Sequence, residues 1–408
     1  MEEKLIQFVN RVANDSPFYQ KIFAENGVEV GDVKSMADFE NLPFSEKADL
    51  RKVYPLGLQA VPDEQIVRIH SSSGTTGDPV IIPYTKQDVT DWAIMFERCY
   101  QYAGITNLDR IQITPGYGLW TAGIGFQAGA ERLGAMVVPM GPGNTQKQIK
   151  MMVDLQTTVI TATSSFALLL AETIAAQGLK DQIALKKGII GSERWGDKMR
   201  NRIINELGIE IYDIYGLTEI YGPGISIDCK HHCGMHYWND YVYMEIIDPV
   251  TLRPVPDGQY GEVVLTTFRK EGAPLLRYRT HDISRIIPGK CPCGSPYPRH
   301  DRILGRTDDM VKVKGVNMFP GQIEDVLRGI DGVSSEYHLH ITHKDGKDAA
   351  ILSFEAEPGV SIDALETMVK NKIKSMIGIT VIPQGGRIGS LPRSEKKTKR
   401  ITDDRFDG

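Results

Sequence analysis

A run of small hydroxyl and glycine residues stands between two apolar, strand-like runs near the start of the chain. It reads His70-Ser-Ser-Ser-Gly-Thr-Thr-Gly-Asp-Pro79, with Ile66–Ile69 before it and Val80–Ile82 at its end. Small residues let the backbone turn tightly, so that amide N–H groups and hydroxyls can converge on phosphate oxygens. Because the lysine of G-x-x-x-x-G-K-[ST] is missing, this is not that P-loop. The run predicts another kind of phosphate loop or, alternatively, a flexible loop without a ligand.

Four of the five cysteines stand in two close groups that a metal could use. Cys229-Lys-His-His-Cys233 precedes a further histidine, and Cys291-Pro-Cys293 follows well downstream. Such thiolates and imidazoles fit a closed tetrahedral Zn²⁺ site that ties two loops together, although the spacing differs from that of paired C-x-x-C fingers. Free cytosolic thiols are the alternative. The predicted zinc ligands are Cys229, His236, Cys291 and Cys293, with Cys233, His231 and His232 as substitutes.

Five motifs in a fixed order resemble those of the adenylate-forming superfamily. They read Ser72-Ser-Gly-Thr-Thr-Gly-Asp-Pro79, Tyr215-Gly-Leu-Thr-Glu219, Tyr278-Arg-Thr-His-Asp282, Gly305-Arg-Thr-Asp-Asp309 and Pro392-Arg-Ser-Glu-Lys-Lys397. Four further motifs are similar to the phenylacetate–CoA ligase branch: Leu42-Pro-Phe-Ser-Glu-Lys47, Gly191-Ser-Glu-Arg-Trp195, Cys291-Pro-Cys-Gly294 and Gly315-Val-Asn-Met-Phe-Pro320. The resemblance spans nearly the whole chain. It implies a ligase that uses ATP and Mg²⁺ to adenylate an aromatic acid and transfers the acyl group to coenzyme A, releasing AMP and pyrophosphate.

The resemblance implies roles on the phosphate side. The acid carboxylate attacks the α-phosphate and pyrophosphate leaves, so donors and cations must already stand where negative charge develops. Thr218 would hold the α-phosphate and Glu219 the Mg²⁺, although Thr218-Glu219 alone also fits a helix start. The implied phosphate loop consists of Ser72, Ser73, Gly74, Thr75, Thr76 and Gly77.

On the nucleoside side the resemblance implies that Tyr215, followed by Gly216, stacks on adenine. Asp282 would accept hydrogen bonds from both ribose hydroxyls, with Arg306 beside it; a solvated aspartate at a strand end is the alternative. His281 stands where the superfamily often has glycine. The remaining purine-side residues implied are Ser192, Glu193, Arg194 and Asp213.

The last motif implies the catalytic lysine. Lys397 would bridge the substrate carboxylate and the α-phosphate, and Lys396, where the family pattern has glycine, is its competitor. Asp308 would be the hinge about which a mobile C-terminal domain reorients, removing Lys397 and bringing its Gly315 face to the thiol. Taken by itself, the charged segment Leu391–Gly408 predicts a solvated tail.

The predicted acid pocket is the segment Gly116–Gly125, which in the family lines the pocket for an aryl acid. Its aromatic and small residues, among them Tyr117, Gly118 and Trp120, suit a flat apolar acyl group. No aspartate stands there to pair with an amine, which favours an aryl or arylacetic acid over an amino acid. The alternative places Tyr117 and Trp120 in the core.

The secondary-structure elements that must position these residues follow two different patterns along the chain. Strand-like runs alternate with helical segments up to about residue 190, which predicts parallel α/β layering, and a β-rich region follows from Met244. After Asp308 the pattern is β-α-β-β-α. We therefore expect an α/β fold with an N-terminal domain over 1–307, whose β-rich subdomain covers about 225–300, and a mobile α+β domain over 308–408.

Composition bounds the remaining possibilities. The 408 residues carry a net charge of −5, with 41% hydrophobic and 24% charged residues. These values are typical of a globular protein with two or three domains, exclude extensive disorder, and argue against nucleic acid or a membrane as partner. The lack of a signal or transit peptide predicts the cytoplasm.

Two other functions stay open at this stage. One is a non-catalytic nucleotide-binding or regulatory protein on the same fold, and the other an adenylating enzyme with a non-CoA acceptor such as an amine or a carrier-protein thiol. The combination of Glu219, Asp282 and Lys397 favours catalysis. Homodimerisation is an expectation from the resemblance.

Overall fold

The computed structural model describes residues 1–72, 78–193, 195–313, 316–344, 347–394 and 398–405. These residues form two compact units, and neither unit is one continuous stretch of chain. The first comprises Met1–Gly141, Thr157–Thr161 and Tyr212–Ile303, and the second Pro142–Gln156, Ala162–Ile211 and Leu304–Gly408. The second unit thus joins part of the expected large domain to the expected C-terminal domain. A boundary at residues 307 and 308 stays a prediction.

Amphipathic helices open the first unit. In the first of them Leu5, Phe8, Val9 and Val12 are buried, as their spacing predicts. Within the described ranges, no helix is both long and apolar enough to span a bilayer. The α-helices of this unit are α1 Glu2–Asp15, α2 Pro17–Asn26, α3 Met36–Phe39, α4 Lys47–Lys52, α5 Lys86–Tyr102 and α6 Ala122–Leu133.

Three strands of the first unit pair in parallel, in the order β5-β3-β4. They are β3 Arg110–Ile113, β4 Met136–Pro139 and β5 Val159–Thr163. Helix α6 connects β3 to β4, as parallel pairing requires, because a tight hairpin cannot return the chain in the same direction. This arrangement confirms the α/β class expected from the sequence.

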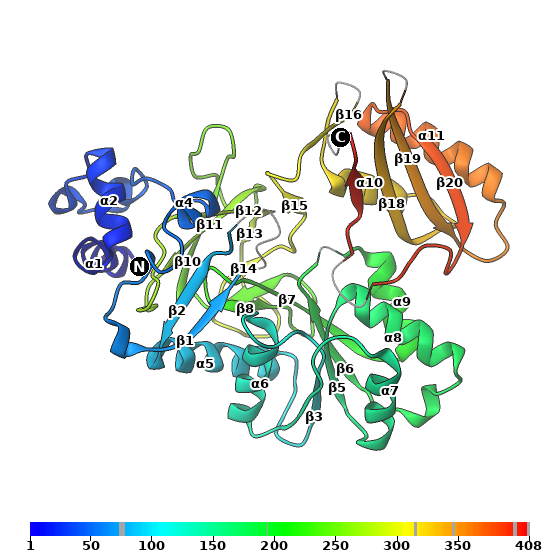
Figure 1. Cartoon of the computed structure of the whole chain (residues 1–408), viewed down its shortest axis with the longest axis horizontal. Helices are drawn as coiled ribbons and strands as arrows, with labels where there is room; N and C mark the ends of the chain where they lie inside the picture. The colour runs from blue at the N-terminus through cyan, green and yellow to red at the C-terminus, as the bar shows by residue number, and fades with distance from the viewer. Residues whose placement is uncertain (73–77, 194, 314–315, 345–346, 395–397, 406–408) are drawn as a thin grey trace. The chain divides into compact units, whose positions relative to one another are not determined.

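Antiparallel strands form the rest of this unit (Figure 1). A hairpin joins β1 Ile66–Ser71 to β2 Ile81–Thr85. A second run has the order β13-β14-β9-β8-β7, and β10, β11 and β12 form a third. Their bounds are β7 Glu210–Leu217, β8 Gly222–Ile227, β9 Met235–Tyr237, β10 Val242–Ile247, β11 Gly261–Thr267, β12 Tyr278–Ser284, β13 Ile286–Ile287 and β14 Arg299–His300.

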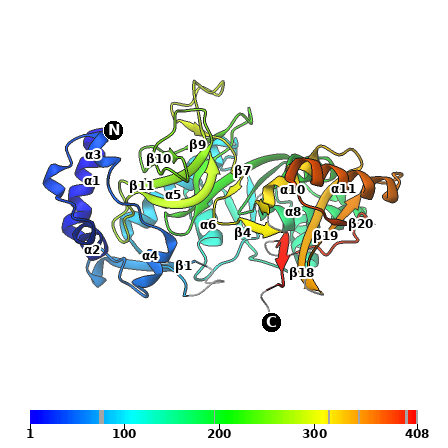
Figure 2. The ribbon, with the colours of Figure 1, turned by 90° about the horizontal axis from the view of Figure 1, so that it is seen from above.

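The second unit holds two groups of elements. The first group is α7 Thr145–Asp154, α8 Ser164–Ala176, β6 Lys187–Gly191 and α9 Asp197–Leu207. The second group is β15 Gly305–Arg306, β16 Val311–Val313, β17 Val316–Met318, α10 Pro320–Arg328, β18 Val333–Lys344, β19 Lys347–Ala356, α11 Ile362–Ile377, β20 Ile382–Arg387 and β21 Ile401–Asp403. Its four-stranded sheet has the order β20-β19-β18-β21, and α10 and α11 cover one face of it (Figures 1 and 2). The expected β-α-β-β-α pattern is confirmed.

Lysine 198 of α9 joins the two groups. Its ammonium donates to the carbonyl oxygens of Leu327 at 3.1 Å and Ile330 at 2.8 Å, and to that of Val333. The last carbonyl groups of a helix have no partner within the helix. Lys198 therefore caps the end of α10 from a neighbouring helix.

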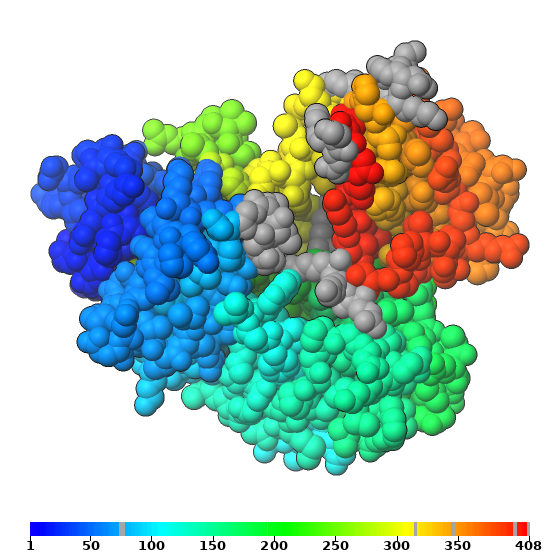
Figure 3. Space-filling model, viewed as in Figure 1, coloured from blue at the N-terminus to red at the C-terminus, as the bar shows by residue number. Residues whose placement is uncertain are grey.

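The charged end of the chain is not the solvated tail that its composition alone predicts. Residues Ile401–Asp403 form β21, which pairs in parallel with β18. Arg400 contacts Glu336 at 2.9 Å and Arg405 contacts Asp348 at 2.7 Å. These charges of the C-terminal segment therefore have partners far away in the sequence. Figure 3 shows this strand, in red, on the face turned to the viewer.

Candidate active site

The predicted adenine and ribose residues lie together. Tyr215 on β7 and Asp282 on β12 are 67 residues apart in the sequence, yet the tyrosine hydroxyl donates to the aspartate Oδ2 at 2.6 Å. Asp282 is only 8% exposed, and its backbone N–H donates to Thr280 Oγ1 at 3.0 Å. The alternative of a solvated aspartate is therefore wrong, because this carboxylate is buried and oriented.

A buried histidine that the sequence analysis did not single out lies against Tyr215. The His300 ring meets the tyrosine ring edge-on, with centroids 5.5 Å apart. Its Nε2 lies 2.7 Å from Ser226 Oγ and its Nδ1 lies 3.3 Å from Ser284 Oγ. Burial lowers the pKa of His300 to about 4, so the ring is neutral near pH 7. A single histidine in a short strand offers no sequence pattern by which to find it.

Two backbone features shape this side of the site. A Cβ at Gly216 would lie 2.1 Å from the carbonyl oxygen of Gly222, so only glycine allows β7 and β8 to approach there. His281 has φ +64°, in the left-handed region that glycine adopts most easily. This explains why glycine suits that position in the wider superfamily. Asp213, also on β7, accepts from the Asp228 N–H at 2.9 Å through its backbone carbonyl.

The base of the predicted phosphate loop is described. Ser72 is buried, its hydroxyl accepts from the Val80 N–H at 2.9 Å, and its own N–H donates to the Val80 carbonyl at 3.0 Å. These contacts close the loop where β1 and β2 meet. Several predicted residues lie outside the described residues: Ser73, Gly74, Thr75, Thr76, Gly77, Arg194, Gly315, Lys396 and Lys397.

The turn after β7 carries the predicted α-phosphate and magnesium residues. Thr218 Oγ1 lies 3.2 Å from Thr121 Oγ1, at the start of α6. Glu219 is only 4% exposed, and its carboxylate lies 3.0 Å from the Lys47 ammonium. The chain continues into β8, so the helix-start alternative is wrong. Lys47 is the last residue of the Leu42–Lys47 motif, which by itself carries no signal for the contact with Glu219.

A second lysine binds the backbone of the same turn. Lys270 is fully buried, and its ammonium donates to the carbonyl oxygens of Glu219, at 3.3 Å, and Ile220. It also lies over the rings of Tyr84 and Tyr221, 4.7 and 5.0 Å from their centroids. Burial lowers the pKa of Lys270 to about 7. The turn is thus fixed through its carbonyl groups, while the Glu219 carboxylate pairs with the Lys47 ammonium.

The predicted acid segment divides into buried and exposed parts. The Tyr117 hydroxyl is buried and, within the described part of the chain, has no hydrogen-bond partner. Burial raises the pKa of Tyr117 to about 12. Trp120 is 51% exposed, so it is not the core aromatic of the alternative reading. Gly118 between them has φ +91°.

Further predicted residues belong to the second unit. Ser192 has φ +71° and directly precedes Glu193, whose carboxylate accepts hydrogen bonds from α8 and from Thr398. Arg306 forms a two-pronged ion pair with the predicted hinge residue Asp308, with both N–O distances 2.8 Å. Both side chains of this pair are more than one-third exposed.

The predicted zinc ligands converge. The ligand atoms of Cys229, His236, Cys291 and Cys293 all lie within 4.8 Å of one another. The Sγ atoms of Cys229 and Cys291 are 3.7 Å apart, and Cys293 Sγ is 3.3 Å from His236 Nε2. The other ring nitrogen of His236 lies 3.0 Å from the Tyr297 carbonyl oxygen. Since metal-bound histidines commonly donate their second N–H to a carbonyl, this contact turns Nε2 toward the thiols.

Cys233 lies beside this group. Its Sγ is 3.5 Å from that of Cys291, and the Arg299 guanidinium donates to it at 3.0 Å. The four-residue set predicted first therefore has the geometry of a candidate metal centre, with Cys233 next to it.

Two known protein families match two parts of this chain. The AMP-binding enzyme family matches residues 9–267, and the AMP-binding enzyme C-terminal domain matches residues 315–405. The chain belongs to the AMP-binding enzyme family, as the resemblance of its ordered motifs implies.

Similar proteins show which members of this family the chain resembles. The chain is 40% identical to the phenylacetate-coenzyme A ligase of Pseudomonas putida over 99% of this chain and 93% of the relative, and 39% identical to that of Escherichia coli K12 over 95% and 90%. A crystal structure of 2-hydroxyisobutyryl-CoA ligase in the postadenylation state, in complex with 2-HIB-AMP, has a TM-score of 0.89 at 26% identity, covering 99% of this chain and 88% of that one. The protein is an AMP-forming acid–thiol ligase, and the predicted ATP-dependent acid–CoA ligation is confirmed.

Proposed function

We propose that this ligase activates phenylacetate, or a closely similar arylacetic or aryl acid, and passes the acyl group to coenzyme A. The hydrogen bond from Tyr215 to Asp282 carries the nucleotide part of this proposal, because it orients an aromatic face and a carboxylate as a nucleoside needs. The names of the relatives support the acid. So does the Tyr117 hydroxyl, which is buried and has no hydrogen-bond partner among the described residues, in a segment of mainly aromatic and small residues.

In the first half-reaction a carboxylate oxygen of the acid attacks the α-phosphorus of ATP, and the bond to pyrophosphate breaks. Tyr215 and Asp282 would hold the nucleoside, while Thr218 and Lys397 meet the charge that develops at the α-phosphate. In the second half-reaction the coenzyme A thiol attacks the acyl carbon, loses its proton and displaces AMP. The assignment of Lys397 comes from its motif.

Magnesium fits the buried Glu219 carboxylate because this hard cation prefers carboxylate oxygens, and the Lys47 ammonium 3.0 Å away shows that a cationic group reaches this carboxylate. When bound, Mg²⁺ would neutralise phosphate charge. Lys47 would remain close enough to share this task. Asp308 is proposed as the hinge between the half-reactions, with its ion pair to Arg306 close to the surface.

The test measures pyrophosphate release with ATP and Mg²⁺ across phenylacetate, indoleacetate, benzoate, fatty acids and amino acids, each with and without coenzyme A. We expect release that depends on an aryl acid, and AMP with a thioester only when coenzyme A is present. Adenylation without thioester formation would point to another acceptor. Silence with every acid, while ATP still binds, would favour a non-catalytic protein.

We also propose a structural zinc ion held by Cys229, His236, Cys291 and Cys293. Sulfur ligands at ~2.3 Å on two corners of a tetrahedron lie about 3.8 Å apart, close to the 3.7 Å between Cys229 and Cys291. Four protein ligands leave no open position, as in a structural site. Metal analysis of protein purified without chelator should find about one zinc per chain, and Cys291→Ser should lose it. Equal zinc content in both proteins would contradict this ligand set.

A homodimer and a cytoplasmic location remain predictions from the sequence. The proposed reaction requires no partner subunit, because the residues assigned to it all come from one chain.

A further inference from the structure

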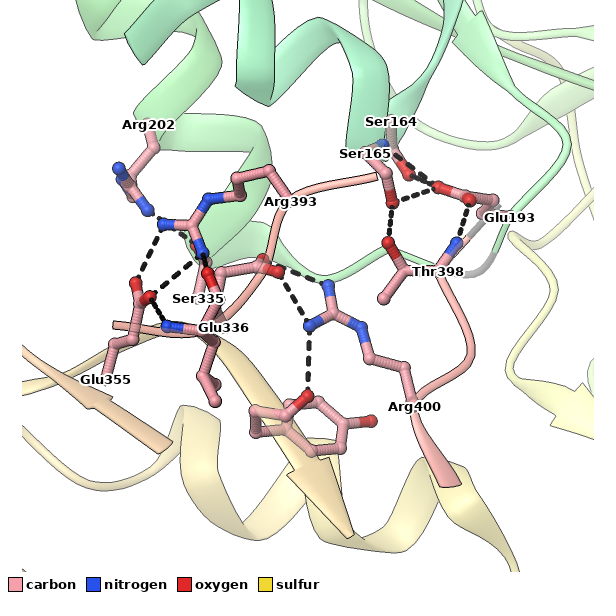
Figure 4. A network of polar contacts seen from close by, with 12 residues as sticks. Ser164, Ser165, Glu193, Arg202, Ser335, Glu336, Glu355, Arg393, Thr398 and Arg400 are labelled. Carbon is pink, nitrogen blue, oxygen red and sulfur yellow. Dashed lines mark hydrogen bonds and ion pairs between the residues drawn. The ribbon is translucent and has the colours of Figure 1, made fainter. Parts of the chain in front are cut away.

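The Glu193 side chain, which the resemblance implies for the purine side of the site, is hydrogen-bonded to two other segments of the second unit. Its Oε2 accepts from the hydroxyls of Ser164 and Ser165, both at 2.7 Å, and from the Ser165 N–H at 2.9 Å. Its Oε1 accepts from the backbone N–H of Thr398 at 2.7 Å. Figure 4 shows the carboxylate between the start of α8 and the chain near its C-terminus. Both carboxylate oxygens are therefore occupied within the second unit.

Thr398 is held at two points. Besides its N–H bond to Glu193, its hydroxyl lies 2.6 Å from the Ser165 hydroxyl. The nitrogen that Glu193 binds belongs to the peptide bond between Lys397 and Thr398. A shift of this peptide would break a charge-assisted hydrogen bond, which is stronger than a bond between neutral groups.

Arg393 provides a second attachment on the other side of the lysines. Its guanidinium contacts Glu172 of α8 at 2.7 and 2.8 Å and Glu355 of β19 at 2.9 Å. The side chain of Arg393 is only 9% exposed, and that of Glu355 is fully buried. Arg202 of α9 also donates to Glu172, at 2.6 Å. Arg393 is thus shared between a helix and the sheet of the C-terminal segment (Figure 4).

The two attachments use the same helix. Ser164 and Ser165 lie at the start of α8, and Glu172 lies about two turns further along it. We infer that Glu193 and Glu172 are positioning residues for the adenylation step, holding the chain before and after Lys397 against α8. This inference rests on the proposed role of Lys397.

Glutamine substitutions test each attachment separately. Glu193→Gln keeps one carbonyl oxygen, so it cannot accept both from Thr398 and from the serines; Glu172→Gln loses the charge that Arg393 and Arg202 share. Neither change removes a cap residue, because the Thr163 hydroxyl still accepts from the Phe166 N–H. The matched control is Glu206→Gln: Glu206 pairs with Arg202 at 3.3 Å and has no hydrogen bond or ion pair with the described residues of 391–400.

Three measurements distinguish positioning from general support. Acid-dependent ATP–pyrophosphate exchange reports adenylation, thioester formation from supplied acyl-adenylate reports the second half-reaction, and hydrogen exchange reports the peptide containing Thr398. We expect Glu193→Gln and Glu172→Gln to slow adenylation about ten- to hundredfold. The KM for ATP and the rate of thioester formation should be unchanged. Hydrogen exchange at the Thr398 amide should be faster. Glu206→Gln should match the parent protein in all three.

Equal losses in both half-reactions would overturn the inference, and so would unchanged adenylation with unchanged hydrogen exchange. If the parent protein shows no ATP–pyrophosphate exchange with any acid, the proposed function fails instead. Hydrogen exchange at Thr398 then decides on the attachment alone: unchanged exchange in both variants overturns it. Since Glu193 and Glu172 are substituted independently, failure of one variant to fold still leaves the other to decide.

Discussion

The nucleoside side of the first unit and the lysine segment of the second are held by different forces. Tyr215, Asp282 and His300 lie on strands, and their contacts are short, mutual and largely buried. Arg393 and Thr398 lie outside regular elements and are held by carboxylates from α8 and from the loop after β6. The first group is thus packed within strands, whereas the second is attached by hydrogen bonds and ion pairs to elements outside its own segment, although the Arg393 side chain is only 9% exposed.

This difference fits the two half-reactions. A nucleoside site has to stay the same throughout the reaction, so packing it among buried strand residues is an advantage. A lysine that serves adenylation alone needs a definite place in only one step, and hydrogen bonds and ion pairs can be exchanged. The comparison makes separate predictions for the two regions.

The largest effect is expected at the lysine itself. Lys397→Ala should lower acid-dependent pyrophosphate release about 100- to 1000-fold, the size seen when a charge-stabilising group at a reacting centre is removed. ATP binding, measured by calorimetry, should be unchanged because the nucleoside side is intact. Lys396→Ala is the matched control and should keep most of the activity; the reverse result would transfer the role to Lys396.

The next effect belongs to the nucleoside side. Asp282→Asn removes the charge that accepts from the Tyr215 hydroxyl. Hydrogen bonds to charged groups contribute about 1.5–3 kcal/mol, so KM for ATP should rise roughly ten- to hundredfold. Steady-state kinetics at saturating acid and coenzyme A will measure it. Tyr215→Phe, which leaves the carboxylate, should cost less. An unchanged KM in Asp282→Asn would mean that this carboxylate does not bind the nucleotide.

The smallest effect tests how far burial alone maintains the nucleoside side. The pKa of His300 is about 4 when folded, below the ~6.5 of an unfolded histidine, so below pH 6.5 the unfolded chain takes up the proton first. The stability from the neutral ring is present above pH ~6.5 and is lost as the pH falls toward 4, amounting to about 2 kcal/mol by pH 5.

Urea unfolding at pH 7 and pH 5 measures this loss. His300→Asn should lose less free energy of unfolding between the two pH values than the parent protein does. The exposed His343 is the control position, because its replacement removes no buried ring. An identical pH dependence in the parent and His300→Asn would show that His300 is not a neutral buried group.

The sequence predicts the parts of this molecule that depend on local pattern. The apolar spacing of α1, the β-α-β-β-α pattern after Asp308 and the cysteine cluster follow from residue type and spacing, and the structure has all of them. The resemblance assigns Tyr215 and Asp282 to one nucleotide site, and the structure brings the two residues together.

The supporting residues could not be predicted in this way. His300, Lys270 and Glu193 are single residues without a repeat or motif of their own. Their partners are brought to them only by tertiary folding: Ser226 is 74 residues from His300, and Thr398 is 205 residues from Glu193. For the same reason, composition predicts a solvated tail where the structure has β21, since its partner strand lies far away in the sequence.

The position of β21 also affects the entropy of the lysine segment. In the order β20-β19-β18-β21, the chain leaves one edge of the sheet after Arg387 and returns at the other with Ile401. The chain between β20 and β21 is thus a connection whose two ends are fixed by strand pairing, rather than a free chain end. The entropy cost of closing this loop is part of the free energy of folding, and it grows only slowly with loop length. Docking against α8 then restricts a short connection, so a few hydrogen bonds can suffice to hold it.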